Sequence, residues 1–140
     1  MALTYTLHPN ASAALQKWHE MIISGNFDSL ATFLHEDVCF RSPVAFTPYQ
    51  GRPTVALILT QVGKVFSDFN YHRQLVADDQ LSAILEFSAQ VNGKQIKGID
   101  MFKFDDEGKI IELEVMIRPL SGLMAVAEQM KARLAPYMNK

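Results

Sequence analysis

The stretch LSAILEFSAQVNGKQIKGIDMFKF, residues 81–104, decides the fold class of this chain. From Leu81 to Val91 every second residue is apolar, and most of the residues between them are polar. This period of two is typical of a strand that buries one face. Asn92-Gly93 follows, and both residues tolerate the positive φ angles of a two-residue hairpin turn. The stretch therefore predicts two antiparallel strands joined by a tight turn.

The alternation continues after a second turn, at residues 105–108. Residues 109–118 place Ile111, Leu113, Val115 and Ile117 on one face, and the pattern predicts another strand. A further strand is expected at 69–77, before the turn at Asp78-Asp79, and a brief one at 38–40, ended by Pro43. We expect residues 45–51 to form a loop.

Helical spacing of apolar residues appears in the first half of the chain and at its end. It predicts helices at 11–24, at 28–34, from residue 53 or 54 to Phe66, and at 121–134. Asn10 or Ser12 is expected to cap the first helix, and Gly25 to end it. Helices, then antiparallel strands, then a closing helix indicate a single α+β domain over residues 1–140, with helices against one face of a curved sheet.

Composition excludes several classes of function. Of the 140 residues, 49% are hydrophobic and 20% charged, with a formal net charge of -2 and no run of Lys or Arg. We therefore expect neither nucleic acid nor a membrane as a partner. The N-terminal residues lack the pattern of a signal peptide, and the single cysteine, Cys39, suits a reducing cytoplasm. The four histidines share no metal-ligand spacing, so no metal site is predicted.

Asp100 is the main candidate for chemistry. Side chains alternate faces along a strand, so Asp100 points the same way as Phe102 and Phe104. A carboxylate aimed into an apolar interior is costly unless it is paired, hydrogen-bonded or protonated. Two interpretations stay open: a catalytic acid in a pocket, whose pKa burial would raise, or a structural carboxylate bonded to a neighbour.

The chain resembles the nuclear transport factor 2-like superfamily, in particular its SnoaL-like branch. The motifs that carry the resemblance are SGNFD at 24–28, FRSPV at 40–44, QGR at 50–52 and IDMFKFDDEGKI at 99–110. The resemblance implies a cone-shaped half-barrel around an apolar pocket, and commonly a homodimer formed through the outer sheet face. It does not imply one activity, because this fold holds both enzymes and binding modules.

Within that superfamily, ketosteroid isomerases pair a general-base Asp with a Tyr and a protonated Asp. Aligning the shared motifs puts the Tyr position at Trp18, the base position at Ser42 and the protonated-Asp position at Asp100. Only Asp100 keeps the family's residue type. A tryptophan N–H can donate but cannot exchange a proton, and a serine needs an activating partner to act as a base. This departure argues against the isomerase reaction itself.

Two classes of function remain open from the sequence. One is an enzyme that isomerises, dehydrates or cyclises a small apolar or aromatic molecule without a cofactor, using Asp100 as acid or acid/base. The other is a non-catalytic binding or scaffold domain. In both, the pocket walls are expected to include these residues: Trp18, Ser42, Phe46, Leu85, Phe87, Phe102, Leu113 and Ile117.

Three other side chains are weighed against ordinary structural roles. His19 is expected to be a partly exposed, unpaired histidine, and His72 could face either the pocket or solvent. Arg118 shares a face with Glu112 and Glu114, which predicts a surface or dimer-interface charge network.

Overall fold

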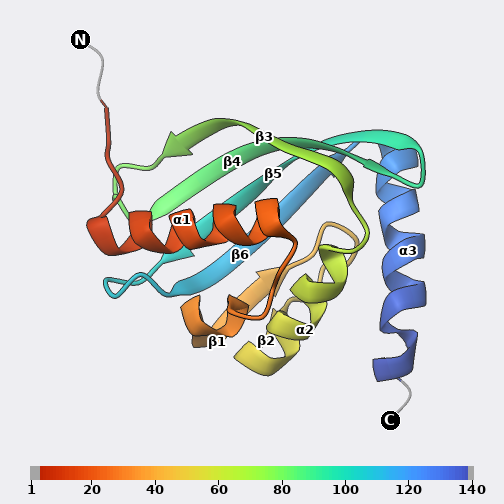
Figure 1. The fold of residues 1–140 in the computed structure, drawn as a ribbon, viewed down its shortest axis with the longest axis horizontal. Coiled ribbons are helices and arrows are strands. Elements are labelled where there is room, and N and C mark those ends of the chain that lie inside the picture. Colours follow the sequence, from red (N-terminus) through yellow and green to blue (C-terminus); the bar gives the residue numbers. More distant parts are fainter. Residues whose placement is uncertain (1–3, 139–140) are drawn as a thin grey trace.

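In the computed structural model, which describes residues 4–138, six strands form one sheet in the order β2-β1-β6-β5-β4-β3 (Figure 1). The elements in chain order are α1 (Pro9–Ser24), the short 3-10 helix η1 (Leu30–Phe33), β1 (Leu34–Arg41), β2 (Tyr49–Gln50), α2 (Arg52–Val62), β3 (Ser67–Val76), β4 (Ser82–Val91), β5 (Lys94–Phe104), β6 (Ile110–Arg118) and α3 (Leu120–Met138). The α+β class predicted from the sequence is confirmed.

The β4–β5 hairpin has an uninterrupted register, with ten consecutive residue pairs from Ser82↔Lys103 to Val91↔Lys94. Its turn residues Asn92 and Gly93 have φ angles of 51° and 80°, as the sequence predicted. β6 pairs antiparallel with β5, but β1 pairs parallel with β6, so the sheet is mainly rather than wholly antiparallel. This parallel pair brings β1, from the first half of the chain, beside the last strand.

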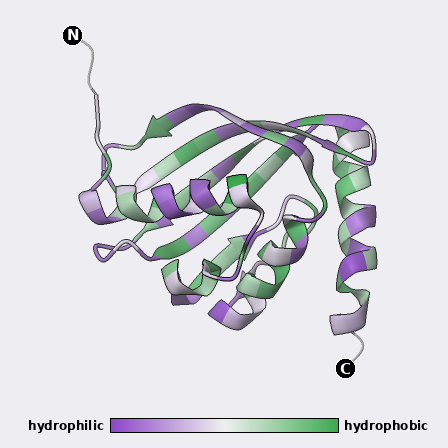
Figure 2. Cartoon of the chain, viewed as in Figure 1, coloured by the Kyte–Doolittle hydropathy of each residue, from purple (hydrophilic) through white to green (hydrophobic). Residues whose placement is uncertain are grey.

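One face of the sheet is covered and the other is open. In Figure 1, α1 and α2 lie across the sheet and α3 stands at one end of it. Hydrophobic and hydrophilic residues alternate along the strands, as the green and purple segments of Figure 2 show. Along β5, residues at alternate positions from Ile96 to Phe104, Asp100 included, are buried. The inner face therefore builds the core, and Asp100 belongs to it.

Several predicted boundaries are wrong. His8, rather than Asn10 or Ser12, caps α1, because its ring accepts a hydrogen bond from the Asn10 N–H at 3.1 Å. The segment 28–34 holds only the 3-10 helix η1, and Leu34 already starts the eight-residue strand β1. Phe66 lies beyond the end of α2, although it still packs against the core.

Other features of the helices agree with the sequence. Gly25 ends α1 in the left-handed conformation, with a φ of 72°. Leu30, Phe33 and Leu34 are buried even though they do not share a helix. Within the described residues, no helix combines the length and the hydropathy that a bilayer-crossing segment needs.

Candidate active site in the apolar cavity

A cavity of about 990 Å³ lies between the inner sheet face and the helices. Its walls come from α1, α2, α3 and all six strands, with the segment after β1 at one side. The aromatic lining residues are Trp18, Phe27, Phe40, Tyr49, Phe66, Phe69, Tyr71 and Phe87. Among the described residues that line it, only Asp100 and Lys131 carry charge. The cavity therefore suits a mainly apolar ligand without a phosphate or other multiply charged group.

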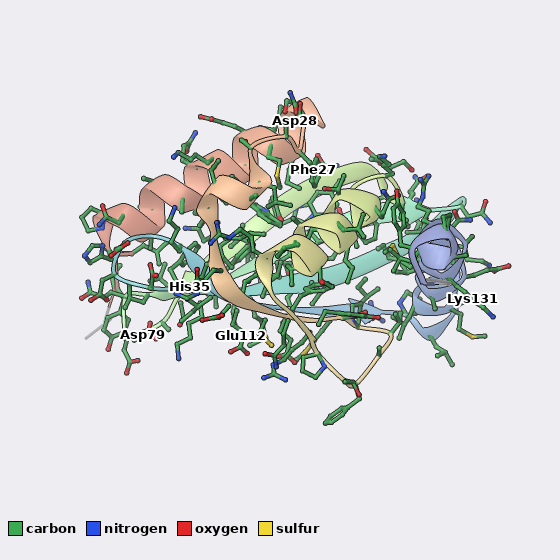
Figure 3. All side chains as sticks on the ribbon, turned by 90° about the horizontal axis from the view of Figure 1, so that it is seen from below. Phe27, Asp28, His35, Asp79, Glu112 and Lys131 are labelled. Atoms are coloured by element: carbon green, nitrogen blue, oxygen red, sulfur yellow. The ribbon has the colours of Figure 1, made fainter. Side chains whose placement is uncertain are left out.

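Two of the lining residues can be located in Figure 3. Phe27 follows α1, and its ring packs so closely on Gly63 that a Cβ there would be 2.9 Å from Cε1 of Phe27. Lys131 lies on α3, the helix seen end-on in Figure 3. Its side chain is exposed, in contrast to that of Asp100, which is only 6% exposed. The buried carboxyl is thus the charged group inside the site.

Asp100 ends a hydrogen-bonded chain of three side chains. Nε1 of Trp18, on α1, donates to Oη of Tyr71, on β3, at 2.8 Å. Oη of Tyr71 donates to Oδ2 of Asp100, on β5, at 2.5 Å. Because an indole N–H can only donate, the phenol oxygen must be the acceptor from Trp18, and its own hydrogen is directed to Asp100. The direction of the chain is fixed by the chemistry of its first member.

The second carboxyl oxygen of Asp100 is free of this chain. Among residues 4–138, no group donates a hydrogen bond to Oδ1, while Asp100 forms part of the cavity wall. An ionised carboxylate has room for several hydrogen bonds. Oδ1 is therefore the atom that a bound molecule can reach.

Burial raises the pKa of Asp100 to about 7, and the hydrogen bond from Tyr71 opposes this rise only in part. Burial also raises the pKa of Tyr71 well above its usual value, and the neighbouring Asp100 charge raises it further. The Tyr71 hydroxyl therefore stays protonated, as a neutral hydrogen-bond donor, at neutral pH. Asp100, by contrast, divides between its acid and its base forms near neutral pH, which is the property of a proton-transfer group.

Aromatic packing holds Tyr71 in place. Its ring meets Phe69 edge-on at a centroid distance of 4.9 Å, and Phe87 and His19 also contact it edge-on. Gly98 makes room for Phe87, since a Cβ at Gly98 would collide with the Met116 carbonyl and come within 2.7 Å of Cζ of Phe87. Gly98 in β5 thus leaves room for the Phe87 ring, which packs against Tyr71.

The structure places most of the predicted wall residues around the cavity. Trp18, Ser42, Phe87, Leu113 and Ile117 line it together with Asp100. Leu85 and Phe102 are buried in the core, but they are not among the lining residues. Phe46 is fully exposed, so its prediction as a pocket wall is wrong. It lies in the loop between β1 and β2, where a hydrophobic residue type does not imply burial.

Tyr71 is the residue that the sequence argument missed. It accepts the hydrogen bond of the Trp18 N–H and donates its own to Asp100, so it stands between the two predicted residues. A signal was present: Phe69 and Tyr71 are aromatic at alternate positions of the expected strand at 69–77. The polar residues around them obscured it.

The remaining candidates lie outside the cavity. His72 is exposed, with Nε2 2.7 Å from Oγ of Ser88. His19 is partly exposed, as expected, but its ring also contacts Tyr71 edge-on, and burial lowers its pKa. Glu112 forms its ion pair with Arg41 at 3.1 Å rather than with Arg118. Within residues 4–138, no three His, Cys, Asp or Glu side chains gather as a metal site would require.

Comparison with known proteins agrees with this fold. The model of the SnoaL-like domain family matches residues 15–113. The chain therefore belongs to the SnoaL-like domain family. A search of the curated proteins returned no match.

Solved structures give the same fold. A protein named as a steroid delta-isomerase, from Pseudomonas aeruginosa, is 49% identical, with a TM-score of 0.93 over 98% of this chain and 100% of the other. An uncharacterised protein with a cystatin-like fold, from Silicibacter pomeroyi, is 30% identical, with a TM-score of 0.82 over 91% of this chain and 86% of the other. The epoxide hydrolase/cyclase-like enzyme SalBIII is 16% identical and covers 80% of this chain and 92% of its own, at a TM-score of 0.66, which shows a shared fold alone.

Proposed function

We propose that this protein is a cofactor-independent enzyme that moves a proton on a neutral, apolar ketone or related molecule, with Asp100 as its acid and base. The observation that carries this proposal is the free Oδ1 of a buried carboxyl with a pKa of about 7, on the wall of an apolar cavity. Isomerisation, dehydration and cyclisation all require such a transfer. Isomerisation is the simplest of them, because one carboxylate can remove a proton and return it elsewhere.

The hydrogen-bonded chain suits Asp100 to this role. In its ionised form, Asp100 keeps one donor, Tyr71, at Oδ2 and offers Oδ1 to a ligand C–H. Once protonated at Oδ1, it can return the proton to another carbon of the same ligand. Apolar walls exclude water around this step, which strengthens the electrostatic interactions within the site.

The name of the 49% identical structure supports the same class of reaction. Trp18 and Ser42 stand at two positions where the resemblance implies Tyr and Asp in ketosteroid isomerases, and this difference counts against isomerisation. Tyr71 weakens that argument, since it brings a phenol to Asp100 from a different strand. We therefore favour isomerisation over the alternative of a non-catalytic binding domain.

A β,γ-unsaturated bicyclic ketone tests the proposal, because its conjugated isomer has a distinct ultraviolet absorbance. We expect wild type to convert it and Asp100→Asn to lose at least a hundredfold in rate, as expected when an essential proton-transfer group is removed. Asp106→Asn, in the exposed turn after β5, is the matched control and should keep the wild-type rate. Equal rates in Asp100→Asn and wild type would reject Asp100 as the catalytic group.

The proposal includes a homodimer formed through the outer sheet face and a cytoplasmic location. The outer face combines partly or fully exposed apolar side chains, such as Leu75 and Met116, with ion pairs of Glu86 to Arg73 and Lys97. Glu112 lies on this face, away from α1 and α2 in Figure 3. Such a mixed surface suits a protein partner.

The single Cys39, which is a free thiol, supports the reducing compartment.

A further inference from the structure

Ser42 directly follows the end of β1, beside the row of the sheet that holds Asp100. Arg41 pairs with Glu114 of β6, so the next residue, Ser42, comes level with Val115. Val115 in turn pairs with Asp100 of β5. All three residues line the cavity. With about 4.8 Å between neighbouring strands, Ser42 and Asp100 are roughly 10 Å apart from Cα to Cα, with only Val115 between them.

The hydroxyl of Ser42 is free to donate. Its Oγ accepts a hydrogen bond from the Val44 N–H at 3.1 Å, in a turn formed by the segment after β1. Among the residues described by the structure, no acceptor takes the hydroxyl hydrogen of Ser42. A hydroxyl that already accepts one hydrogen bond is polarised and becomes a better donor.

The other polar groups of the cavity are less suited to this position. The Trp18 N–H and the Tyr71 O–H are already engaged in the chain to Asp100. Tyr49 also lines the cavity, but it lies on the edge strand β2, three strands from β5. It pairs with Phe40 of β1, which is in a different row from Asp100. Ser42 is therefore the free hydroxyl nearest to Asp100 along the sheet.

We propose that Ser42 donates a hydrogen bond to the carbonyl oxygen of the ketone whose α C–H is deprotonated by Asp100. This inference rests on the proposed function and adds a second catalytic residue to it. The separation of roughly 10 Å between the Cα atoms accommodates a C–C=O unit with a contact of about 3 Å at each end. The assignment also reverses the roles implied by the resemblance, because the base is at Asp100 and the hydrogen-bond donor stands where the base would be.

The step balances without a co-reactant. The α C–H bond breaks, and its proton passes to Oδ1 of ionised Asp100. The electron pair of that bond forms the C=C of an enolate, and the negative charge gathers on the carbonyl oxygen. Ser42 stabilises that oxygen by its hydrogen bond, as oxyanion-hole donors do. Asp100 then returns the proton to a ligand carbon, or, after exchange with D₂O, a deuteron.

Two measurements on one probe, 2-tetralone, test the role of Ser42. Together they distinguish a failure of the Ser42 inference from a failure of the proposed function. The first is deuterium incorporation at the α carbon in D₂O, followed by NMR. The second is the infrared carbonyl stretch of the bound ketone, which requires no turnover. The variants are Ser42→Ala, Tyr49→Phe, Asp100→Asn and, as a serine control on the outer sheet face, Ser88→Ala.

We expect Ser42→Ala to slow the exchange about 10²- to 10³-fold, the usual effect of removing one oxyanion donor. The carbonyl band should also shift to higher frequency in Ser42→Ala and stay unchanged in Ser88→Ala. A wild-type carbonyl band in Ser42→Ala would overturn the Ser42 inference, and so would a change in Tyr49→Phe alone. Loss of exchange in Asp100→Asn with no effect in Ser42→Ala would leave the proposed function standing without Ser42. No exchange in wild type, with the Ser42-dependent band shift present, would reject Asp100 chemistry and retain Ser42 as the ligand donor.

Discussion

Tyr71 and Asp100 lie on strands that are not neighbours, and yet the tyrosine donates a 2.5 Å hydrogen bond to the carboxyl. β4 runs between their strands, β3 and β5. Both side chains point to the inner face, and Phe87 of β4, which pairs with Tyr71, contacts the phenol ring edge-on. The interaction exists because the tyrosine is long enough to reach across a strand on the covered face of the sheet.

Stability should depend on the ionisation of Asp100. Its pKa in the folded protein, about 7, exceeds the ordinary 3.8, so between these values the folded state holds a proton that the unfolded state has lost. The stabilisation is full below pH 3.8 and is lost as the pH rises to 7, by on the order of 4 kcal/mol, because one pKa unit corresponds to about 1.4 kcal/mol.

This pH-dependent stabilisation is measured by urea unfolding of wild type and Asp100→Asn. The measurement is repeated at several pH values between 4 and 8, a range set by that pKa. The difference between the two free energies of unfolding isolates Asp100, since Asp79 and Glu86, whose pKa values are lowered, titrate alike in both proteins. We expect the wild-type free energy to decline across this range relative to the variant. Parallel curves would show that the folded carboxyl titrates at its ordinary value.

Tyr71→Phe should raise the pKa of Asp100 further, because the hydrogen bond that it removes favours the carboxylate. It also leaves the Trp18 N–H without its acceptor, which should cost about 1–3 kcal/mol in the free energy of unfolding. NMR titration of the carboxyl carbon of Asp100 measures the first effect. The control is Tyr5→Phe, a residue with 39% exposure. A lower pKa in Tyr71→Phe would contradict the donor direction assigned here.

Phe87 and Phe46 should respond in opposite ways to truncation. Phe87 is 1% exposed and stacks on Phe69, so Phe87→Ala should lower the free energy of unfolding by about 3–5 kcal/mol. Phe46 is fully exposed, and Phe46→Ala should change it by less than about 0.5 kcal/mol. Chemical denaturation of both variants measures these values. A large loss in Phe46→Ala would mean that this residue is covered in the assembled protein.

The outer-face dimer predicts that one methionine matters and another does not. Met116, on β6, is 48% exposed, and Met124, on α3, is 63% exposed. A carboxylate buried at an interface is costly, so Met116→Glu should convert the dimer to monomer, whereas Met124→Glu should remain dimeric. Sedimentation velocity distinguishes these states. A monomeric wild type would contradict the dimer itself. Dissociation by Met124→Glu alone would place the dimer contact on α3 instead of the outer sheet face.

Features with a local physical cause were predictable. The β4–β5 hairpin follows from alternation and from two residues that accept positive φ, and Gly25 ends α1 for the same conformational reason. The boundaries of β1 were not predictable in this way. Leu34–Arg41 carries exposed charged residues at its start, and its strand conformation depends on pairing with β6, which is distant in sequence.

The sequence by itself determined that Asp100 faces the core, because the pleat of a strand puts alternate residues on opposite faces whatever surrounds them. Only the tertiary structure decided what Asp100 meets there. Tyr71 reaches it across β4, Trp18 reaches Tyr71 from α1, and the parallel pairing of β1 with β6 brings Ser42 to the wall of the same cavity. Those partners depend on the order and register of strands that are far apart along the chain. A local pattern of apolar and polar residues does not encode them.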